Sequence, residues 1–200
     1  MHGEVSIGAL RAAAARCRAC PLWKIGTQTV FGAGPARPQV RLIGEQPGDR
    51  EDRLGEPFVG PAGRVLDEAL AAAGLPRARV YLTNAVKHFK WKPAAKRRLH
   101  ERPNAREVRA CRPWLEAEIA RLAPRAIGVL GATAAKSLLG TGFKVSEQRG
   151  VAVASQLAPI VIATVHPSSL LRMPDPKMRE RETARFVADL RTLRELAGRR

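Results

Sequence analysis

Four polar side chains in this sequence could each carry out a different kind of chemistry. Glu45 could act as a base or stabilise a cation, whereas the adjacent Gln46 cannot titrate and so cannot be a general base. The Asn84 amide offers one hydrogen-bond donor and one acceptor. His100 and His166 could serve near neutral pH as nucleophile or hydrogen-bond donor. These side chains are the candidate chemical groups of the chain.

The three cysteines, Cys17, Cys20 and Cys111, are an odd number, so a disulfide framework is not expected. The two-residue gap between Cys17 and Cys20 lets both thiolates bind one metal centre. A redox-active Cys-x-x-Cys pair is the competing interpretation. That interpretation leaves Cys111 without a role.

Short apolar runs alternate with helical patterns along the chain, which predicts an α/β fold. The runs are nearly continuous in apolar residues, as expected for strands buried on both faces. We predict one three-layer αβα domain over residues 1–200, with a central, mainly parallel four-stranded sheet. The expected strands are Val40–Gly44, Arg79–Val86, Ala126–Gly131 and Pro159–Val165; the expected helices are Arg64–Ala73, Val108–Leu122, Thr133–Leu139 and Lys177–Ala197; a hairpin is expected over Val145–Ser155.

Ligands bind at the carboxyl ends of the strands in folds of this kind. That rule points to residues 44–48, Thr83-Asn84, the loop after Gly131, and residues 166–169. Three of these four segments carry clustered polar groups. The first continues into a glycine-rich and proline-rich loop in which Phe58 could stack on a base, although Phe58 could equally pack in the core.

The formal net charge of +17 over 200 residues favours a polyanionic partner. Residues 87–112 contain ten Lys or Arg and two acids, an excess typical of a nucleic-acid-binding face. A generally basic proteome is the alternative explanation.

No run approaches the roughly 20 apolar residues of a membrane span, and the N-terminus lacks a secretory pattern. We therefore expect a soluble, cytoplasmic, monomeric protein.

Four motifs, taken in this order along the chain, resemble those of the uracil-DNA glycosylase superfamily. They are GEQPGD at 44–49, PFVGPAG at 57–63, TNAVKH at 83–88 and HPSSLLR at 166–172. The match runs from Cys17 to Arg172 and is most similar to the iron–sulfur-containing branch, family 4. Two departures resemble the UdgX type: Gln46 stands where family 4 has a small residue, and residues 91–102 form an insertion containing KRRLH.

The resemblance implies an enzyme that flips uracil out of DNA, including single-stranded DNA, and cuts its bond to the sugar. In the UdgX type, the histidine matching His100 then joins covalently to the sugar C1′, and the residue matching Glu45 supports it. His166 could hydrogen-bond uracil O2 as negative charge develops there. The implied catalytic residues are His100, Glu45, His166 and Gln46; the implied uracil contacts are Asn84, Phe58, Gln46, Asp49 and Gly44; and the implied DNA contacts are Lys87, Lys96, Arg97, Arg98, Ser168, Ser169 and Arg172.

The resemblance also implies a metal group. Family 4 places its third cysteine just after the Thr-Asn motif, where this chain has His88. We therefore expect Cys17, Cys20, His88 and Cys111 to bind a [4Fe–4S] cluster. Donor chemistry alone favours structural zinc, because three Cys and one His suit tetrahedral zinc whereas clusters usually take four Cys.

Two further functions fit parts of the sequence. One is an ordinary family 4 enzyme that turns over, with His100 only contacting phosphate beside Arg97 and Arg98. The other is a non-catalytic nucleic-acid-binding module, which would explain the charge and the metal site but not the polar groups at three strand ends. The enzymatic interpretation requires Glu45, Asn84, His100 and His166 to meet in one place.

Overall fold

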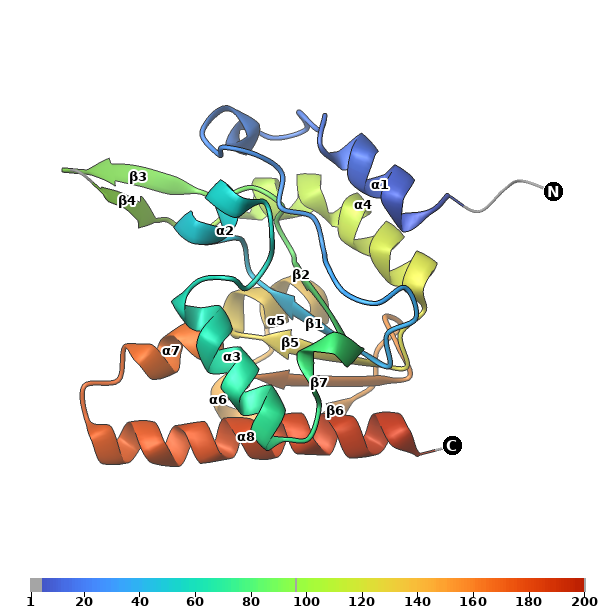
Figure 1. Ribbon diagram of the computed structural model, residues 1–200, viewed down its shortest axis with the longest axis vertical. Helices are drawn as coiled ribbons and strands as arrows, with labels where there is room; N and C mark the ends of the chain where they lie inside the picture. The colour runs from blue at the N-terminus through green and yellow to red at the C-terminus, as the bar shows by residue number, and fades with distance from the viewer. Residues whose placement is uncertain (1–4, 96, 200) are drawn as a thin grey trace.

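A five-stranded sheet with the strand order β2-β1-β5-β7-β6 forms the centre of the computed structural model, which describes residues 5–95 and 97–199 (Figure 1). The first four strands in this order run parallel, whereas β6 pairs antiparallel with β7. The mainly parallel sheet is therefore confirmed, but it has five strands rather than four. The strands are β1 Val40–Gly44, β2 Val80–Asn84, β5 Ala126–Leu130, β6 Ala152–Val153 and β7 Ile160–Thr164.

The helices begin and end at residues that favour these boundaries. Asn104 caps α4 by accepting the Glu107 N–H at 3.0 Å, and Glu107 accepts the Asn104 N–H in return. Pro61 opens α3, where a missing N–H costs nothing. The helices are α1 Ile7–Ala14, α2 Asp49–Leu54, α3 Pro61–Ala72, α4 Ala105–Leu122, α5 Ala132–Leu139, α6 Val145–Gln148, α7 Pro167–Leu171 and α8 Pro176–Gly198, with 3-10 turns η1 Pro21–Lys24 and η2 Arg77–Arg79.

Helices cover both faces of the sheet and give the predicted three layers. On one face, Leu42 of β1 belongs to a core that includes Leu70 of α3 and Leu190 of α8. On the other face, Ile43 belongs to a second core with Leu115 of α4. Because successive residues of a strand point to opposite faces, both must be apolar, which explains the continuous apolar runs of the sequence.

Residues 91–100 form a two-stranded hairpin that projects beyond the helical layers (Figure 1). Its strands are β3 Trp91–Ala94 and β4 Arg97–His100. Trp91 pairs with His100, and Pro93 pairs with Arg98. A proline is tolerated here because a strand of an isolated hairpin has a free edge.

The hairpin predicted over Val145–Ser155 is wrong. Val145–Gln148 is the short helix α6, and only Ala152–Val153 pairs with β7. Gly150, at φ 76, turns the chain and donates its N–H to the Ala163 carbonyl oxygen. The segment therefore pairs with the sheet only after this turn.

No helix in the described ranges has the length and apolar character to cross a membrane.

Candidate active site

The carboxyl ends of three parallel strands bring polar residues to one edge of the sheet. Gly44, the last residue of β1, lies beside Asn84, the last residue of β2, in the strand register. Glu45 therefore leaves the sheet next to Asn84. His166 follows the end of β7 and is the N-cap of α7. The structure thus gathers these segments at one edge, as the strand-end rule predicts.

Gly44 is the point at which Asn84 and Phe58 approach the backbone. A Cβ atom on residue 44 would lie 2.4 Å from Asn84 Oδ1 and 2.8 Å from Phe58 Cζ. Phe58 is buried in the core, as the alternative interpretation expected, at the left-handed φ of 57°. Its ring also stacks on His166 with 6.1 Å between centroids. Phe58 therefore forms a wall between Gly44 and His166.

The side-chain amide of Asn84 is buried and available to bind a ligand. The residue is 2% exposed, and its backbone carbonyl accepts a hydrogen bond from Lys87 Nζ at 2.9 Å. Within the described residues, its side-chain amide makes no hydrogen bond. A rigidly placed amide of this kind can offer both a donor and an acceptor to a ligand.

His166 is held in the tautomer that carries its proton on Nε2. Its Nδ1 accepts the Ser168 N–H at 3.2 Å and lies 2.8 Å from Ser168 Oγ. Arg172 Nη1 donates to that same Oγ at 3.0 Å, so the hydroxyl proton is free to point at Nδ1. Burial, reinforced by the charges of Arg172 and His100, lowers the pKa of His166 to about 4. The ring is therefore neutral near pH 7 and presents Nε2–H as a donor.

His100 reaches the sheet edge from the hairpin. Its Nε2 lies 3.7 Å from Glu45 Oε1, a buried oxygen with no hydrogen-bond partner among the described residues. Burial lowers the pKa of His100, and Arg172 and Arg102 lower it further, although Glu45 opposes them. The charge of His100 in turn disfavours protonation of His166. The contacts thus join His100 to Glu45, and they join His166 through Phe58 to the backbone at Gly44 beside Asn84.

The side chain of Gln46 hydrogen-bonds the backbone at the base of the hairpin, whereas the sequence predicted contacts with uracil and the reacting groups. Its Nε2 donates to the carbonyl oxygens of Lys90 at 3.2 Å and Glu101 at 2.9 Å. Its Oε1 accepts the Lys90 N–H at 3.0 Å. Lys90 and Glu101 flank β3 and β4, so the structure assigns the Gln46 amide to closing the base of the hairpin. The two departures from family 4 noted in the sequence are therefore physically linked.

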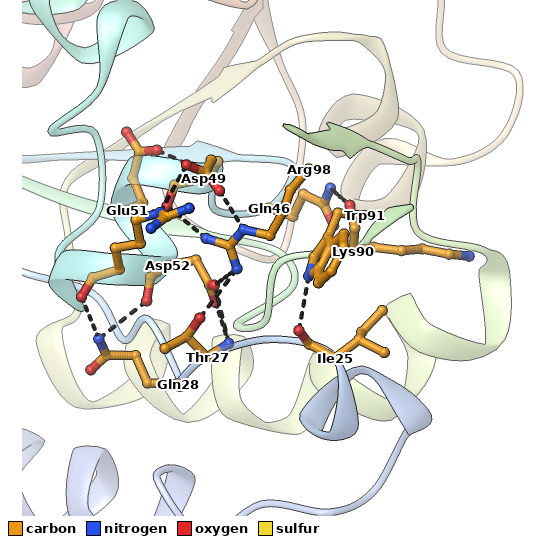
Figure 2. A network of polar contacts seen from close by, with 12 residues as sticks. Ile25, Thr27, Gln28, Gln46, Asp49, Glu51, Asp52, Lys90, Trp91 and Arg98 are labelled. Carbon is orange, nitrogen blue, oxygen red and sulfur yellow. Dashed lines mark hydrogen bonds and ion pairs between the residues drawn. The ribbon is translucent and has the colours of Figure 1, made fainter. Parts of the chain in front are cut away.

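Asp49 and Arg98 bind each other, although the sequence predicted uracil contact for one and DNA contact for the other. Arg98 Nε pairs with Asp49 Oδ1 (Figure 2). Arg53 pairs with the second oxygen of Asp49 at 3.0 Å. Arg98 also binds Asp52 Oδ2 at 2.6 Å. The pairing favours the charged guanidinium and raises the pKa of Arg98, although burial opposes this shift. Arg98 therefore fixes the hairpin on α2.

The predicted DNA contact of Lys87 is wrong. Lys87 is 1% exposed and forms an ion pair with the fully buried Glu118. Its Nζ also donates to Thr83 Oγ1 at 2.6 Å. A lysine enclosed in this way cannot reach a phosphate, because leaving Glu118 unpaired in the interior would be costly.

The remaining predicted DNA contacts differ in accessibility. Arg97 and Arg172 are exposed, and Ser168 and Ser169 are half-buried on α7. Ser169 Oγ donates to the His166 carbonyl oxygen at 2.7 Å, which steadies the loop. Lys96 lies outside the described residues.

Glu51 was not identified from the sequence, yet it joins two loops of the site. Its buried carboxylate accepts the Gly60 N–H at 2.7 Å and the Gly48 N–H at 3.1 Å. These glycines belong to the loops that carry Gln46 and Phe58. The sequence analysis predicted no helix here, and an acidic residue in the first turn of α2 ordinarily indicates no more than a helix N-terminus.

The predicted metal ligands line one shared small pocket. Cys17, Cys20, His88 and Cys111 all contribute to its wall. The Trp114 indole N–H donates to Cys17 Sγ at 3.2 Å, and the Lys87 N–H donates to Cys111 Sγ at 3.2 Å. Such N–H···S contacts stabilise thiolate character.

The spacing of these residues bears on which group they could hold. Within residues 5–95 and 97–199, no three His, Cys, Asp or Glu side chains lie close enough together to hold a metal ion. His88 Nε2 instead lies 3.0 Å from Thr29 Oγ1. Three thiols and one imidazole are donors that either zinc or an iron–sulfur cluster could take, but their present spacing forms no closed metal site.

Comparison with known proteins gives consistent matches. The family model described as "Uracil DNA glycosylase superfamily" matches residues 31–191. A type-4 uracil-DNA glycosylase of Pyrobaculum aerophilum is 38% identical over 165 residues, which are 79% of this chain and 81% of that protein. A type-4 uracil-DNA glycosylase of Thermotoga maritima is 37% identical over 82% of each chain. One from Archaeoglobus fulgidus is 33% identical over 92% of this chain and 89% of its own length.

Proposed function

This chain belongs to the uracil-DNA glycosylase superfamily and is a DNA N-glycosylase that excises uracil, and from this premise we propose that His100 then captures the abasic sugar. The product would be a covalent protein–DNA adduct at C1′. The observation that carries this proposal is the 3.7 Å approach of His100 Nε2 to the unpaired, buried Glu45 Oε1. A nucleophile with a base beside it is the arrangement that covalent catalysis requires.

Uracil recognition is assigned to Asn84, Gly44 and Phe58. The Asn84 amide can donate to uracil O4 and accept from N3–H, whereas cytosine presents the opposite pattern. A mismatched buried group costs about 1–3 kcal/mol. Gly44 leaves the space in front of the amide open, because a larger residue would collide with both Asn84 and Phe58.

His166 is assigned to the leaving group. As the C1′–N1 bond breaks, its electron pair departs with uracil, and negative charge spreads to O2. The neutral Nε2–H of His166 can donate to that oxygen, because Nδ1 is already occupied by Ser168. A preorganised donor aimed at developing charge is worth about 3–4 kcal/mol in comparable sites.

Glu45 and His100 are assigned to the sugar. The Glu45 carboxylate stabilises positive charge on the sugar as uracil leaves. One ring nitrogen of His100 then forms the bond to C1′, and the proton on the other nitrogen passes to Glu45. Because partial burial lowers the pKa of His100, the neutral, nucleophilic imidazole is favoured near pH 7. The proposed mechanism has no step that hydrolyses the bond between His100 and C1′. Each protein molecule would therefore react once.

Cys17, Cys20, His88 and Cys111 are assigned to a [4Fe–4S] cluster. Three thiols and an imidazole around one cavity support this assignment, as do the two N–H donors directed at Cys17 and Cys111. The group would cross-link the N-terminal segment to α4 and to the loop after β2, and we assign it a structural role. Brown colour with broad visible absorbance would distinguish it from colourless zinc.

A denaturing gel tests the covalent step. Wild-type protein mixed with uracil-containing single-stranded DNA should give a complex that survives SDS and heat, and a thymine-containing strand should not. His100→Ser should abolish the complex while uracil is still released. Leu99→Ala is the matched control on the same strand, because Leu99 is exposed and carries no reactive group. A cross-link formed by His100→Ser protein would refute the role of His100.

A further inference from the structure

Arg98 attaches the hairpin to two segments that are distant in sequence (Figure 2). Its Nη1 binds Asp52 Oδ2 of α2 at 2.6 Å and Thr27 Oγ1 of the N-terminal segment at 3.2 Å. Its guanidinium also lies over the rings of Phe89 and Trp91, at 5.4 and 5.3 Å from the centroids. Arg98 is therefore fixed by charge, hydrogen bonds and ring contacts together.

Asp52 connects these segments directly. Its carboxylate is fully buried and accepts the backbone N–H of Thr27 at 2.9 and 3.1 Å, in addition to the bond from Arg98. A single carboxylate thus holds the N-terminal segment and the hairpin on α2. Because the group is buried and charged, its geometry is set by the partners that satisfy it.

Trp91 makes the second connection. It lies directly opposite His100 in the hairpin register. Its indole Nε1–H donates to the Ile25 carbonyl oxygen at 2.8 Å (Figure 2). The residue paired with His100 is therefore tied to the N-terminal segment.

The N-terminal segment is itself attached to the sheet. Ala33 exchanges two backbone hydrogen bonds with Leu82 of β2, at 2.9 and 2.8 Å. The Val30 N–H donates to the Lys87 carbonyl oxygen at 2.8 Å. The segment therefore gives the hairpin a support that is anchored on the body of the protein.

We propose that Asp52 and Trp91 are positioning residues for covalent capture, which act by holding His100 over the sugar through the N-terminal segment. This inference rests on the proposed function. Asn84, Glu45 and His166 are positioned by the ends of β1, β2 and β7, so their geometry does not depend on these two contacts. Loss of the contacts should therefore impair capture more than excision. The protein would then release uracil, and water would add to C1′ of the cationic sugar in place of His100, losing a proton and leaving an abasic site.

The experiment measures adduct formed per uracil released, in single-turnover reactions with uracil-containing single-stranded DNA. The variants are Asp52→Asn, which removes the charge, and Trp91→Phe, which removes only the indole N–H. Glu116→Gln is the matched control, because it breaks an exposed ion pair with Arg112 on α4. We expect the adduct yield per uracil to fall about tenfold or more in both test variants, since a 1 Å misplacement can cost about 100-fold.

Hydrogen exchange of residues 91–100 provides a readout that does not depend on chemistry. Exchange should be faster in both test variants than in wild type and Glu116→Gln. Unchanged adduct yields and exchange rates would overturn the inference, as would a proportional loss of excision and capture accompanied by lower thermal stability. If wild-type protein releases uracil without forming an adduct, the proposed function fails, and the exchange rates alone decide whether the contacts hold the hairpin.

Discussion

Glu45 Oε1 lies 3.7 Å from His100 Nε2, and different elements of the fold position the two residues. Glu45 is positioned by the end of β1, whereas His100 is carried by the β3–β4 hairpin, whose base Gln46 closes. Glu45 Oε1 has no hydrogen-bond partner among the described residues although it is buried. A buried carboxylate oxygen without a partner is unfavourable until a cation or a donor approaches it. The cationic sugar and the imidazolium are the two species that would do so.

Replacing Glu45 with Gln should slow uracil excision about 100-fold or more, because the amide cannot stabilise the cationic sugar. Capture should fall further, since a neutral amide cannot accept the proton of His100. Single-turnover release of labelled uracil measures the first effect, and the SDS-resistant fraction measures the second. Excision at the wild-type rate would show that Glu45 does not act on the sugar.

Replacing Gly44 with Ala should close the uracil pocket. The new methyl would lie 2.4 Å from Asn84 Oδ1 and 2.8 Å from Phe58 Cζ, so one of these side chains must move. We expect uracil release to fall about 100-fold, because a 1 Å displacement of a binding group can have that effect. Gly142→Ala is the matched control, since nothing lies within 4 Å of a Cβ at that position. Equal rates for the two variants would contradict the pocket assignment.

The four long strands could be predicted because burial on both faces demands continuous apolar residues. Each predicted range contains the observed strand, and that of β1 matches it at both ends. The β3–β4 hairpin could not be predicted in this way, since it lies outside the core. Its strands contain Pro93 and several cations, and it is held by side chains of other segments, such as Gln46 and Asp52. The sequence of the hairpin itself does not indicate which distant side chains will bind it.

The location of the site was predictable, but the use of each polar residue was not. Asn84 ends β2 and His166 follows β7, and the fold alone brings such residues to one edge. Lys87 and Arg98 are cations in a basic stretch, which predicted phosphate contact for both. Whether a lysine faces solvent or a buried acid depends on its tertiary partner, and Glu118 lies 31 residues away. The basic stretch therefore marks a charged face without identifying which cations remain free.

Stability should depend on the protonation of His166. Burial lowers the pKa of His166 from 6.5 to about 4, so between these values the unfolded chain binds a proton that the folded protein does not. The free energy of unfolding should therefore decrease as pH falls through this window, by at most about 1.4 kcal/mol per pH unit. Chemical denaturation of wild-type and His166→Asn protein at pH 4.5 to 7.5 measures the difference. Parallel pH profiles would mean that His166 titrates normally.

Removal of the metal group should distinguish a shared site from a redox pair. If Cys17, Cys20 and Cys111 bind one cluster, replacing any of them with Ala should remove iron and lower the free energy of unfolding. A group present at 1,000 times its Kd stabilises by about 4 kcal/mol. If Cys17 and Cys20 were a redox pair, Cys111→Ala would leave the redox chemistry intact and cost only its packing.

Iron and zinc content, measured with thermal unfolding on the same samples, separates these cases. Cys111 supports the shared site physically, because its sulfur lines the same cavity as the other two and accepts the Lys87 N–H. Trp114→Phe, which removes the N–H bonded to Cys17, should retain the metal but weaken its binding by about 10–100-fold. Full iron content in Cys111→Ala protein would exclude Cys111 as a ligand and would reopen the redox interpretation of Cys17 and Cys20.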